Sequence, residues 1–192
     1  MRYPTDHKEK THRRILKAAS RAFRENGYVG TGIDAVMKDA GLTPGGFYSH
    51  FDSKEALLAE TIAVTVERTK ELLLAGLEEH EGLDWLQEVV RRYLSRQHRD
   101  MAADGCPLPA FTSDISRCGD LAKESFENQF RSLLSEIEGK LPDNGISARD
   151  RAIATIALCI GGLMLARAVK DPTLSDQILM ACRRMAVLKE EK

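Results

Sequence analysis

Apolar side chains recur at intervals of three and four residues along almost the whole chain, and hardly any segment alternates between apolar and polar positions. The first spacing places apolar groups on one face of an α-helix, whereas strict alternation is typical of a half-buried strand. The 192-residue chain is therefore expected to be all-α, with roughly nine helices and no sheet.

Three short helices are predicted near the N-terminus. The first has its apolar face within 15–23, and Gly27 suits its C-terminal end. The second covers 33–40 and is expected to stop at Gly41. Thr43 suits the N-cap of the third, and a proline follows at the first helical position, where its missing N–H costs nothing. Such short helices bury little alone, so we expect them to form one small head.

A long helix follows this head. Asp52-Ser53 is expected to cap its start, with Glu55 three residues after Asp52 as in a capping box, and the apolar pattern then continues to Leu77. A helix of this length is expected to belong to both the head and the remainder of the chain. We therefore expect a small N-terminal head over 1–60 and a helical body over 61–192.

The body continues the helical pattern. Ser147 with Asp150, and Thr173 with Asp176, each match a capping box at the start of one of the last two helices. Turn-forming residues over 104–109 predict a loop. The apolar stripe of the first is predicted to be Ile153, Ala157, Ile160, Met164 and Ala168. The residues predicted to face inward in the second are Leu174, Ile178, Cys182 and Met185.

Composition narrows the class of protein. Apolar residues make up 43% and charged residues 30%, with a net charge of -1, which excludes both disorder and a uniformly basic chain. The positive charge is concentrated at one end, because residues 1–24 carry eight Lys or Arg against two acids. No apolar run reaches the ~18–20 residues of a membrane helix, and the N-terminus lacks the apolar core of a signal peptide. A cytoplasmic protein without membrane contact is expected.

Cysteine spacing and the absence of catalytic motifs argue against metal sites and enzymes. The four cysteines (Cys106, Cys118, Cys159 and Cys182) form no C-x-x-C pair, which favours a reducing compartment. No Cys/His group has zinc spacing, so no metal and no cofactor are expected. There is no nucleophile elbow, glycine-rich phosphate loop or H-E-x-x-H motif, so the chain is not expected to be an enzyme.

The segment 33–51 has the spacing of a helix-turn-helix, in which the second helix lies in the major groove of DNA. That helix begins with Gly45 and Gly46, each of which destabilises a helix by about 1 kcal/mol relative to alanine. Such a start makes physical sense if another surface, here the DNA backbone, must approach closely. Phe47 and Phe51 are four residues apart and are expected to face the core of the head. The three residues between them, Tyr48, Ser49 and His50, are then expected to face outward.

These residues make the chain recognisable. The runs ILKAA at 15–19, FRENGY at 23–28, TGIDAV at 31–36 and AGLTPGGFYSHFDSKEAL at 40–57 closely resemble the DNA-binding head of the tetracycline-repressor (TetR) family. The resemblance covers roughly residues 8–60 with nearly no gaps. It implies an all-helical homodimer, a third helix that reads a near-palindromic operator in double-stranded DNA, and a body that binds a small-molecule effector.

Carried over by position, the resemblance assigns two groups of residues to DNA. The DNA-facing set is Thr43, Pro44, Gly45, Gly46, Tyr48, Ser49 and His50, and Thr31 and Lys54 are assigned to phosphates. Gly32 departs from the family, because Ser or Thr usually caps the second helix there. Pro44 and Gly46 replace side chains that often touch DNA, so more of the specificity is expected from Tyr48 and His50. Alternatively, Tyr48 closes the core of the head and His50 is an ordinary surface residue.

In the body, the resemblance implies a dimer interface and an effector site. The last two helices carry continuous apolar faces with small residues, which fits a four-helix interface between two subunits; ordinary intrachain core is the alternative. An apolar effector cavity is predicted to be lined by Trp85, Tyr93, Phe111, Phe126, Phe130 and Met164. His98 and Arg99 are candidate polar anchors, and plain core packing is the alternative for each lining residue.

Cys106 suggests a second mode of control. It lies in a loop before a short helical segment, where backbone N–H groups could stabilise a thiolate. The sequence therefore predicts a repressor released from its operator by a small apolar effector. The alternative is a repressor that senses oxidants or electrophiles through Cys106. A buried, inert thiol is the simpler reading of this residue.

Overall fold

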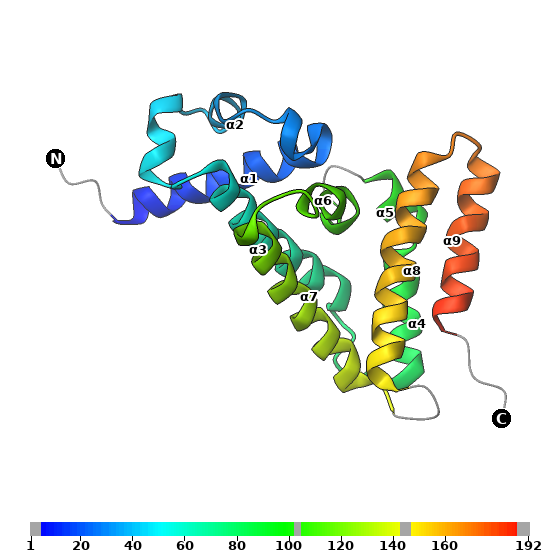
Figure 1. Ribbon diagram of the computed structural model, residues 1–192. Helices are drawn as coiled ribbons and strands as arrows, with labels where there is room; N and C mark the ends of the chain where they lie inside the picture. The colour runs from blue at the N-terminus through cyan, green and yellow to red at the C-terminus, as the bar shows by residue number, and fades with distance from the viewer. Residues whose placement is uncertain (1–4, 102–104, 143–146, 188–192) are drawn as a thin grey trace, which may run out of the picture. The chain divides into compact units, whose positions relative to one another are not determined.

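The computed structural model describes residues 5–101, 105–142 and 147–187, and over these residues all regular secondary structure is helical, with no strand (Figure 1). The prediction of an all-α fold is confirmed. The elements are α1 Thr5–Gly30, α2 Ile33–Asp39, the 3₁₀ helix η1 Pro44–Ser49, α3 Lys54–Leu74, α4 Gly82–Tyr93, α5 Arg96–Asp100, α6 Leu108–Ile115, α7 Asp120–Lys140, α8 Ala148–Ala168 and α9 Pro172–Ala186.

Two glycines punctuate the N-terminal helices where the sequence predicted breaks. Gly27 has φ 71° and kinks α1 three residues before its end, and Gly41 has φ 67° just after α2. A positive φ favours glycine because it has no Cβ to clash. The Arg14 side chain adds a second constraint at Gly41: its Nη2 donates to the carbonyl oxygen of Ala40 at 2.6 Å. This basic residue is therefore engaged with the end of α2.

The described chain divides into two compact units. Unit 1 contains residues 1–66 and 110–129, and unit 2 contains 67–109 and 130–192. Three helices, α3, α6 and α7, therefore contribute residues to both units. The expected division of the sequence at 60/61 did not anticipate that residues 110–129 join the head.

Residues 110–129 join the head through three polar contacts. Asp114 accepts the backbone N–H of Tyr28 at 2.7 Å, just after the kink in α1. Glu55 accepts the N–H of Ala122 at 3.3 Å in the first turn of α7. The Ser125 hydroxyl donates to the Ala59 carbonyl at 2.6 Å. Each bond satisfies a helix-end or internal group that would otherwise need water.

Unit 2 is built around α8 and α9, which run side by side and pack along each other (Figure 1). Helix α4 packs against both, and α5 packs against α8. α8 is buried on the face that contains Ala152, Ile156, Cys159, Leu163 and Ala166. The apolar stripe predicted for α8 is not the face that the chain buries, since Ile153 and Met164 are 41% and 39% exposed. α9 is also rotated from the prediction: Leu179 is buried, whereas Leu174 and Met185 are exposed.

The structure keeps two of the predicted helix caps and changes one. Ser53, of the predicted pair Asp52-Ser53, caps α3, because its hydroxyl accepts the N–H of Ala56 at 3.0 Å. Asp171 caps α9 by accepting the N–H of Thr173, so the predicted box from Thr173 to Asp176 was wrong. Ser147 caps α8 through the N–H of Asp150 at 3.1 Å, as predicted.

The expected loop over 104–109 is shorter in the structure. Helix α6 already begins at Leu108, so the last two residues of that stretch are helical. Asp104, and the turn at 143–145 expected to separate α7 from α8, lie outside the described residues.

Within the part of the chain that the structure describes, α8 alone is long and apolar enough to cross a membrane by length and composition. The core helix of a soluble protein passes the same test, so this is weak evidence for a membrane span. α8 packs along α9 and against α4. Its apolar character is therefore accounted for in part by contacts inside unit 2.

Candidate nucleic-acid interface

The short helix η1 is held in the head by aromatic residues. Phe47 is fully buried and Phe51 is 4% exposed, and their rings stack with centroids 5.7 Å apart. Val36 and Met37 of α2 are buried in the same unit, and α2 contacts η1 directly. The spacing of Phe47 and Phe51 correctly predicted that both face the core. This packing fixes which side of η1 faces outward.

The outward side of η1 is uncharged. Five of the predicted DNA-facing residues are exposed, and Gly46 and His50 are half-buried. The exposed five are Thr43, Pro44, Gly45, Tyr48 and Ser49; we call them the recognition surface. Tyr48 is 69% exposed although its ring meets Phe47 edge-on at 5.1 Å. The alternative that Tyr48 closes the core of the head is therefore wrong.

The recognition helix differs in detail from the prediction. It is a 3₁₀ helix of six residues, and Thr43 stands at its N-cap without a side-chain hydrogen bond. The glycines are not required by the fold: neither has a positive φ, and a Cβ at Gly45 would meet nothing within 4 Å. At Gly46 it would make only ordinary contact with Met37 at 3.6 Å. Space for close approach is thus left on the outer side.

His50, at the C-terminal end of η1, lies beside a histidine that sequence reasoning missed. The ring of His12, on α1, stacks on Phe51 with a centroid distance of 4.4 Å and lies 5.8 Å from the ring of His50. His12 Nε2 is 2.6 Å from the carboxylate of Glu60 on α3. Burial lowers the pKa of His50, and the neighbouring His12 and Lys8 lower it further. His12 falls on the N-terminal side of the first apolar run, and nothing in the spacing marks it.

Thr31 lies inside the head, with its hydroxyl engaged by the backbone. Its side chain is buried, and its hydroxyl lies 2.7 Å from the carbonyl oxygen of Gly27 and 3.0 Å from that of Ala22. The hydroxyl therefore serves the kinked end of α1. The assignment of Thr31 to phosphate stays a prediction.

Lys54 lies at the first turn of α3, and its ammonium group sits 4.4 Å from the centroid of the Tyr28 ring. Burial lowers the pKa of Lys54, while the nearby Cys118 and Asp114 act in the opposite direction. A cation over an aromatic face is stabilised by the ring quadrupole. Lys54 therefore has a partner within the head, and its contact with phosphate stays a prediction. Gly32 stands at the N-cap of α2 without a side-chain hydrogen bond, as the sequence indicated.

Comparisons with known proteins agree with this geometry. A family model described as "Bacterial regulatory proteins, tetR family" matches residues 15–61. The chain is 24% identical to the HTH-type transcriptional regulator YxaF of Bacillus subtilis over 184 residues, which cover 93% of this chain and 95% of YxaF. The chain belongs to the TetR family. Its relatives are DNA-binding transcriptional regulators and not enzymes.

Solved TetR-family structures share the fold over nearly the whole chain. A TetR-family regulator from Agrobacterium tumefaciens matches with a TM-score of 0.77 at 18% identity, over 94% of this chain and all of the other. The structure of AibR in complex with isovaleryl coenzyme A and operator DNA matches with a TM-score of 0.66 at 16% identity, over 92% of this chain and 98% of AibR. At these identities the likeness shows the fold.

In the body of this TetR-family chain, the six predicted cavity residues fall in different environments. Phe111 and Phe126 belong to unit 1, and Trp85, Tyr93, Phe130 and Met164 belong to unit 2. Phe111 is buried and meets Phe23 edge-on at 6.3 Å, so it is part of the head core. Met164 is 39% exposed. Neither unit contains the whole predicted set, and an effector cavity stays a prediction.

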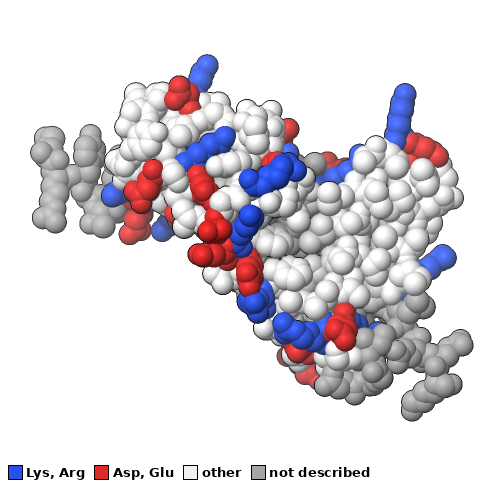
Figure 2. Space-filling model, in the orientation of Figure 1, with Lys and Arg blue, Asp and Glu red and all other residues white. Residues whose placement is uncertain are grey.

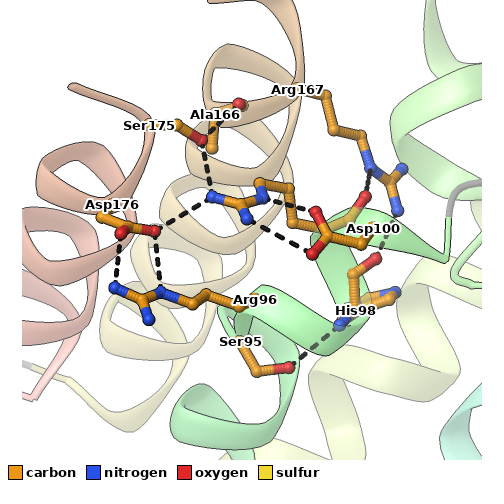
Figure 3. Close-up of polar contacts among 9 residues, drawn as sticks. Ser95, Arg96, His98, Asp100, Ala166, Arg167, Ser175 and Asp176 are labelled. Atoms are coloured by element: carbon orange, nitrogen blue, oxygen red, sulfur yellow. Dashed lines mark hydrogen bonds and ion pairs between the residues drawn. The ribbon is translucent and has the colours of Figure 1, made fainter. Parts of the chain in front are cut away.

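The two candidate polar anchors already have protein partners. Arg99 bonds Ser175 and Asp176 of α9, each at 3.0 Å, and Asp100 at 2.7 Å (Figure 3). Asp176 also accepts from Arg96, and this contact is the first cause of its lowered pKa. This cluster of charges ties α5 to α9.

His98 holds the loop that contains Cys106. Its Nδ1 is 2.7 Å from the carbonyl oxygen of Tyr93, and its Nε2 is 2.9 Å from the backbone nitrogen of Cys106. These contacts require Nδ1 to donate and Nε2 to accept, so the ring is neutral. Burial lowers the pKa of His98. Gly105 permits the approach, because a Cβ there would lie 2.8 Å from Nε2.

Cys106 is buried at 3% exposure, and its backbone N–H is committed to His98. The N–H expected to stabilise a thiolate therefore points to an imidazole. Burial also raises the pKa of Cys159 to about 12, with Cys106 and Cys182 as further causes. Cys159 is itself buried, at 6% exposure.

Helices α8 and α9 expose a second surface of different chemistry. Six of their large apolar side chains are at least 39% exposed: Ile153, Met164, Leu165, Leu174, Met180 and Met185; we call them the α8–α9 face. Figure 2 shows that residues other than Lys, Arg, Asp and Glu cover most of the surface over these helices in that view. Apolar residues therefore lie on both faces of α8, and the chain buries only one of them.

Proposed function

We propose that this TetR-family regulator is a homodimeric repressor whose recognition surface binds a near-palindromic operator and whose body responds to a small apolar effector. The observation that carries the proposal is the way in which η1 presents its outward residues. It presents Tyr48, Ser49 and two glycines that the fold does not need, on a helix anchored by buried Phe47. A helix with this anchoring can enter a groove as a rigid element, and glycines allow the DNA backbone to come close.

The lack of charge on η1 assigns different roles to different parts of the head. Base edges are read by hydrogen bonds and apolar contacts, for which a phenol, a hydroxyl and a neutral imidazole are suited. Phosphates are held mainly by Lys and Arg. In this chain these would come from the N-terminal segment and, for one contact, from Lys54.

The α8–α9 face is the proposed dimer interface. A homodimer is typical of the family, and a second copy would cover the exposed side of α8 and α9 with an identical apolar surface. Two subunits paired in this way would present two copies of η1. Half-sites about one helical turn (~34 Å) apart, or somewhat more, match such a pair.

Effector control is proposed on the family pattern. An effector that binds the body would favour a dimer whose two heads no longer fit the operator, which requires that it bind the two states with different affinity. Apolar side chains of the body would form most of its contacts. We place the protein in the cytoplasm, where its DNA is.

The test is a mobility shift with the DNA that flanks the protein's own gene, at about 0.15 M salt. A saturable shift that an unrelated duplex of equal length does not give is expected. Equal shifts with both duplexes would contradict the proposal. A variant with Leu165→Lys in the α8–α9 face should bind the same DNA more weakly because it pairs poorly.

A thiol switch at Cys106 is the second candidate and has less support. Cys106 is 3% exposed, so an oxidant has little access to its thiol. The location of Cys106 supports a switch, because His98 contacts both the backbone of Cys106 and the last residue of α4. Diamide should release operator from the wild type and not from Cys106→Ser if the switch exists. Equal release from both, or from neither, would leave effector control as the only mode.

A further inference from the structure

The recognition surface lacks the side chains that most often distinguish bases through paired hydrogen bonds. No Lys, Arg, Asn or Gln lies between residues 43 and 51. Arg and Lys are the usual readers of guanine, through its O6 and N7 atoms, and Asn and Gln are the usual readers of adenine, through N6 and N7. If η1 reads an operator, it therefore distinguishes base pairs through other contacts.

The groups that the recognition surface presents are largely apolar. Thr43 and Pro44 are exposed and carry a methyl group and a pyrrolidine ring. Tyr48 is 69% exposed, and its ring is supported edge-on by the fully buried ring of Phe47. Among the groups that distinguish base pairs in the major groove, the C5 methyl of thymine is the apolar one. These side chains therefore match thymine better than guanine or cytosine.

Gly45 leaves open space beside the Tyr48 ring. A 3₁₀ helix has about three residues per turn, so residues three apart lie on the same side. Gly45 and Tyr48 are separated by one such turn of η1. A Cβ at Gly45 would meet nothing within 4 Å, and its φ is not positive, so neither packing nor backbone conformation requires a glycine there. An open surface next to an aromatic ring has room for a methyl group at the edge of a base.

Ser49 adds a polar contact whose direction is defined by the structure. Its hydroxyl donates to the carbonyl oxygen of Gly46 at 2.7 Å. Because a hydroxyl has a single proton, Ser49 can then only accept a hydrogen bond from DNA. The donors that bases present in the major groove are the N6 amino group of adenine and the N4 amino group of cytosine. The adenine amino group lies in the same base pair as a thymine methyl group, so both contacts are compatible with A·T pairs.

We propose that η1 reads A·T pairs of the operator, with thymine methyl groups in contact with Tyr48 and Pro44 beside the open surface at Gly45. Ser49 accepts a proton from the amino group of adenine. Tyr48 is the specificity-determining residue, since its ring supplies most of the apolar contact. Charged residues elsewhere in the head hold phosphates, which carry no sequence information. The inference rests on the proposed function.

The test replaces thymine by uracil, one position at a time, in the operator located by the mobility shift described above. This change removes the C5 methyl group and keeps every hydrogen-bonding group of the base. The full-length protein should lose roughly fourfold in affinity at each contacted thymine, the effect of one buried methyl group. Fluorescence anisotropy measures the loss. Tyr48→Phe should keep this dependence because the ring remains, and Tyr48→Ala should lose most of it.

Two further variants sharpen the test. Lys38→Ala changes an exposed cation in the last turn of α2, and it should leave the uracil effect unchanged. Gly45→Ala places a methyl group in the open surface. It should not lower the free energy of unfolding, because the Cβ has room. It should weaken binding to the thymine operator, and uracil should restore part of the loss because the two methyl groups compete for one space.

The outcomes separate this inference from the proposed function. Specific binding by the wild type that uracil changes at no thymine would overturn this inference alone. A uracil effect in Tyr48→Ala as large as that in the wild type would do the same. A wild type without sequence preference would overturn the proposed function itself.

Discussion

Two exposed surfaces of this chain, the recognition surface of unit 1 and the α8–α9 face of unit 2, are exposed for different reasons. The recognition surface is small, polar and rich in glycine, and it lies on a helix whose other side is fixed by buried aromatic rings. The α8–α9 face is broad and apolar, and it lies on helices that already pack against each other and against α4. The first has the character of a surface that meets a polar partner, and the second that of an unfinished hydrophobic core.

This difference predicts that neighbouring substitutions on η1 will separate folding from binding. Phe47→Ala empties a fully buried site and should lower the free energy of unfolding by about 3–5 kcal/mol. Tyr48→Ala should change it by less than about 0.5 kcal/mol, because the side chain is 69% exposed. Urea unfolding measures both. Similar losses from the two variants would mean that η1 does not have a buried and a free side.

A charge placed on the α8–α9 face should weaken dimer formation. Leu165→Lys places a charge on a side chain that is 58% exposed in the single chain. If a second copy covers it, the dimer dissociation constant should rise at least ~100-fold, or about 2.7 kcal/mol. Sedimentation equilibrium would show this, with Leu72→Lys, at a 66% exposed position on α3, as the matched control. Equal dimerisation of both variants would place the interface elsewhere.

His98 should make the stability of the body depend on pH. Burial lowers its pKa in the folded chain from an ordinary value of 6.5, so the unfolded chain binds the proton more readily. Its contribution to stability is then complete above about pH 6.5 and is lost as the pH falls below it. The free energy of unfolding should fall more between pH 7.5 and 5.5 in the wild type than in His98→Gln. Parallel curves would show that the ring is not held neutral.

The smallest expected effects distinguish two helix starts. Ser147 caps α8 through a hydrogen bond, so Ser147→Ala should cost about 1 kcal/mol. Thr43 stands at the N-cap of η1 without such a bond, and Thr43→Ala should cost less than about 0.5 kcal/mol while still weakening operator binding. Thermal unfolding and a mobility shift measure the two effects. A full capping cost at Thr43 would argue that the residue serves the fold instead of DNA.

The head was more predictable from sequence than the body, for a physical reason. Its elements are fixed by local signals: Gly41 at a positive φ, a proline after Thr43, and two phenylalanines four residues apart. Helix α8 carries apolar residues all round, so periodicity could not tell which face the chain buries, and the face chosen from sequence was the exposed one. Such a helix defines its partner faces only through tertiary packing.

Long-range polar partners were also beyond the sequence. Asp176 was expected at a capping-box position, but the N-cap of α9 is Asp171, two residues before the expected one, and Asp176 pairs with Arg96 and Arg99, which are about eighty residues away. Thr31 matches a family DNA contact, yet its hydroxyl is turned to carbonyl groups of α1. The group that a side chain contacts depends on which helix ends come close to each other. The spacing of residues along one helix does not contain that information.

The most direct test of the account measures sequence preference through one side chain. Fluorescence anisotropy at about 0.15 M salt should give the wild type a dissociation constant at least ~10³-fold lower for its own operator than for a scrambled duplex. Tyr48→Ala should lose about 1–3 kcal/mol of that preference while its binding to the scrambled duplex stays the same. Equal affinity of the wild type for both duplexes, or an unchanged preference in Tyr48→Ala, would contradict the claim that η1 reads the operator.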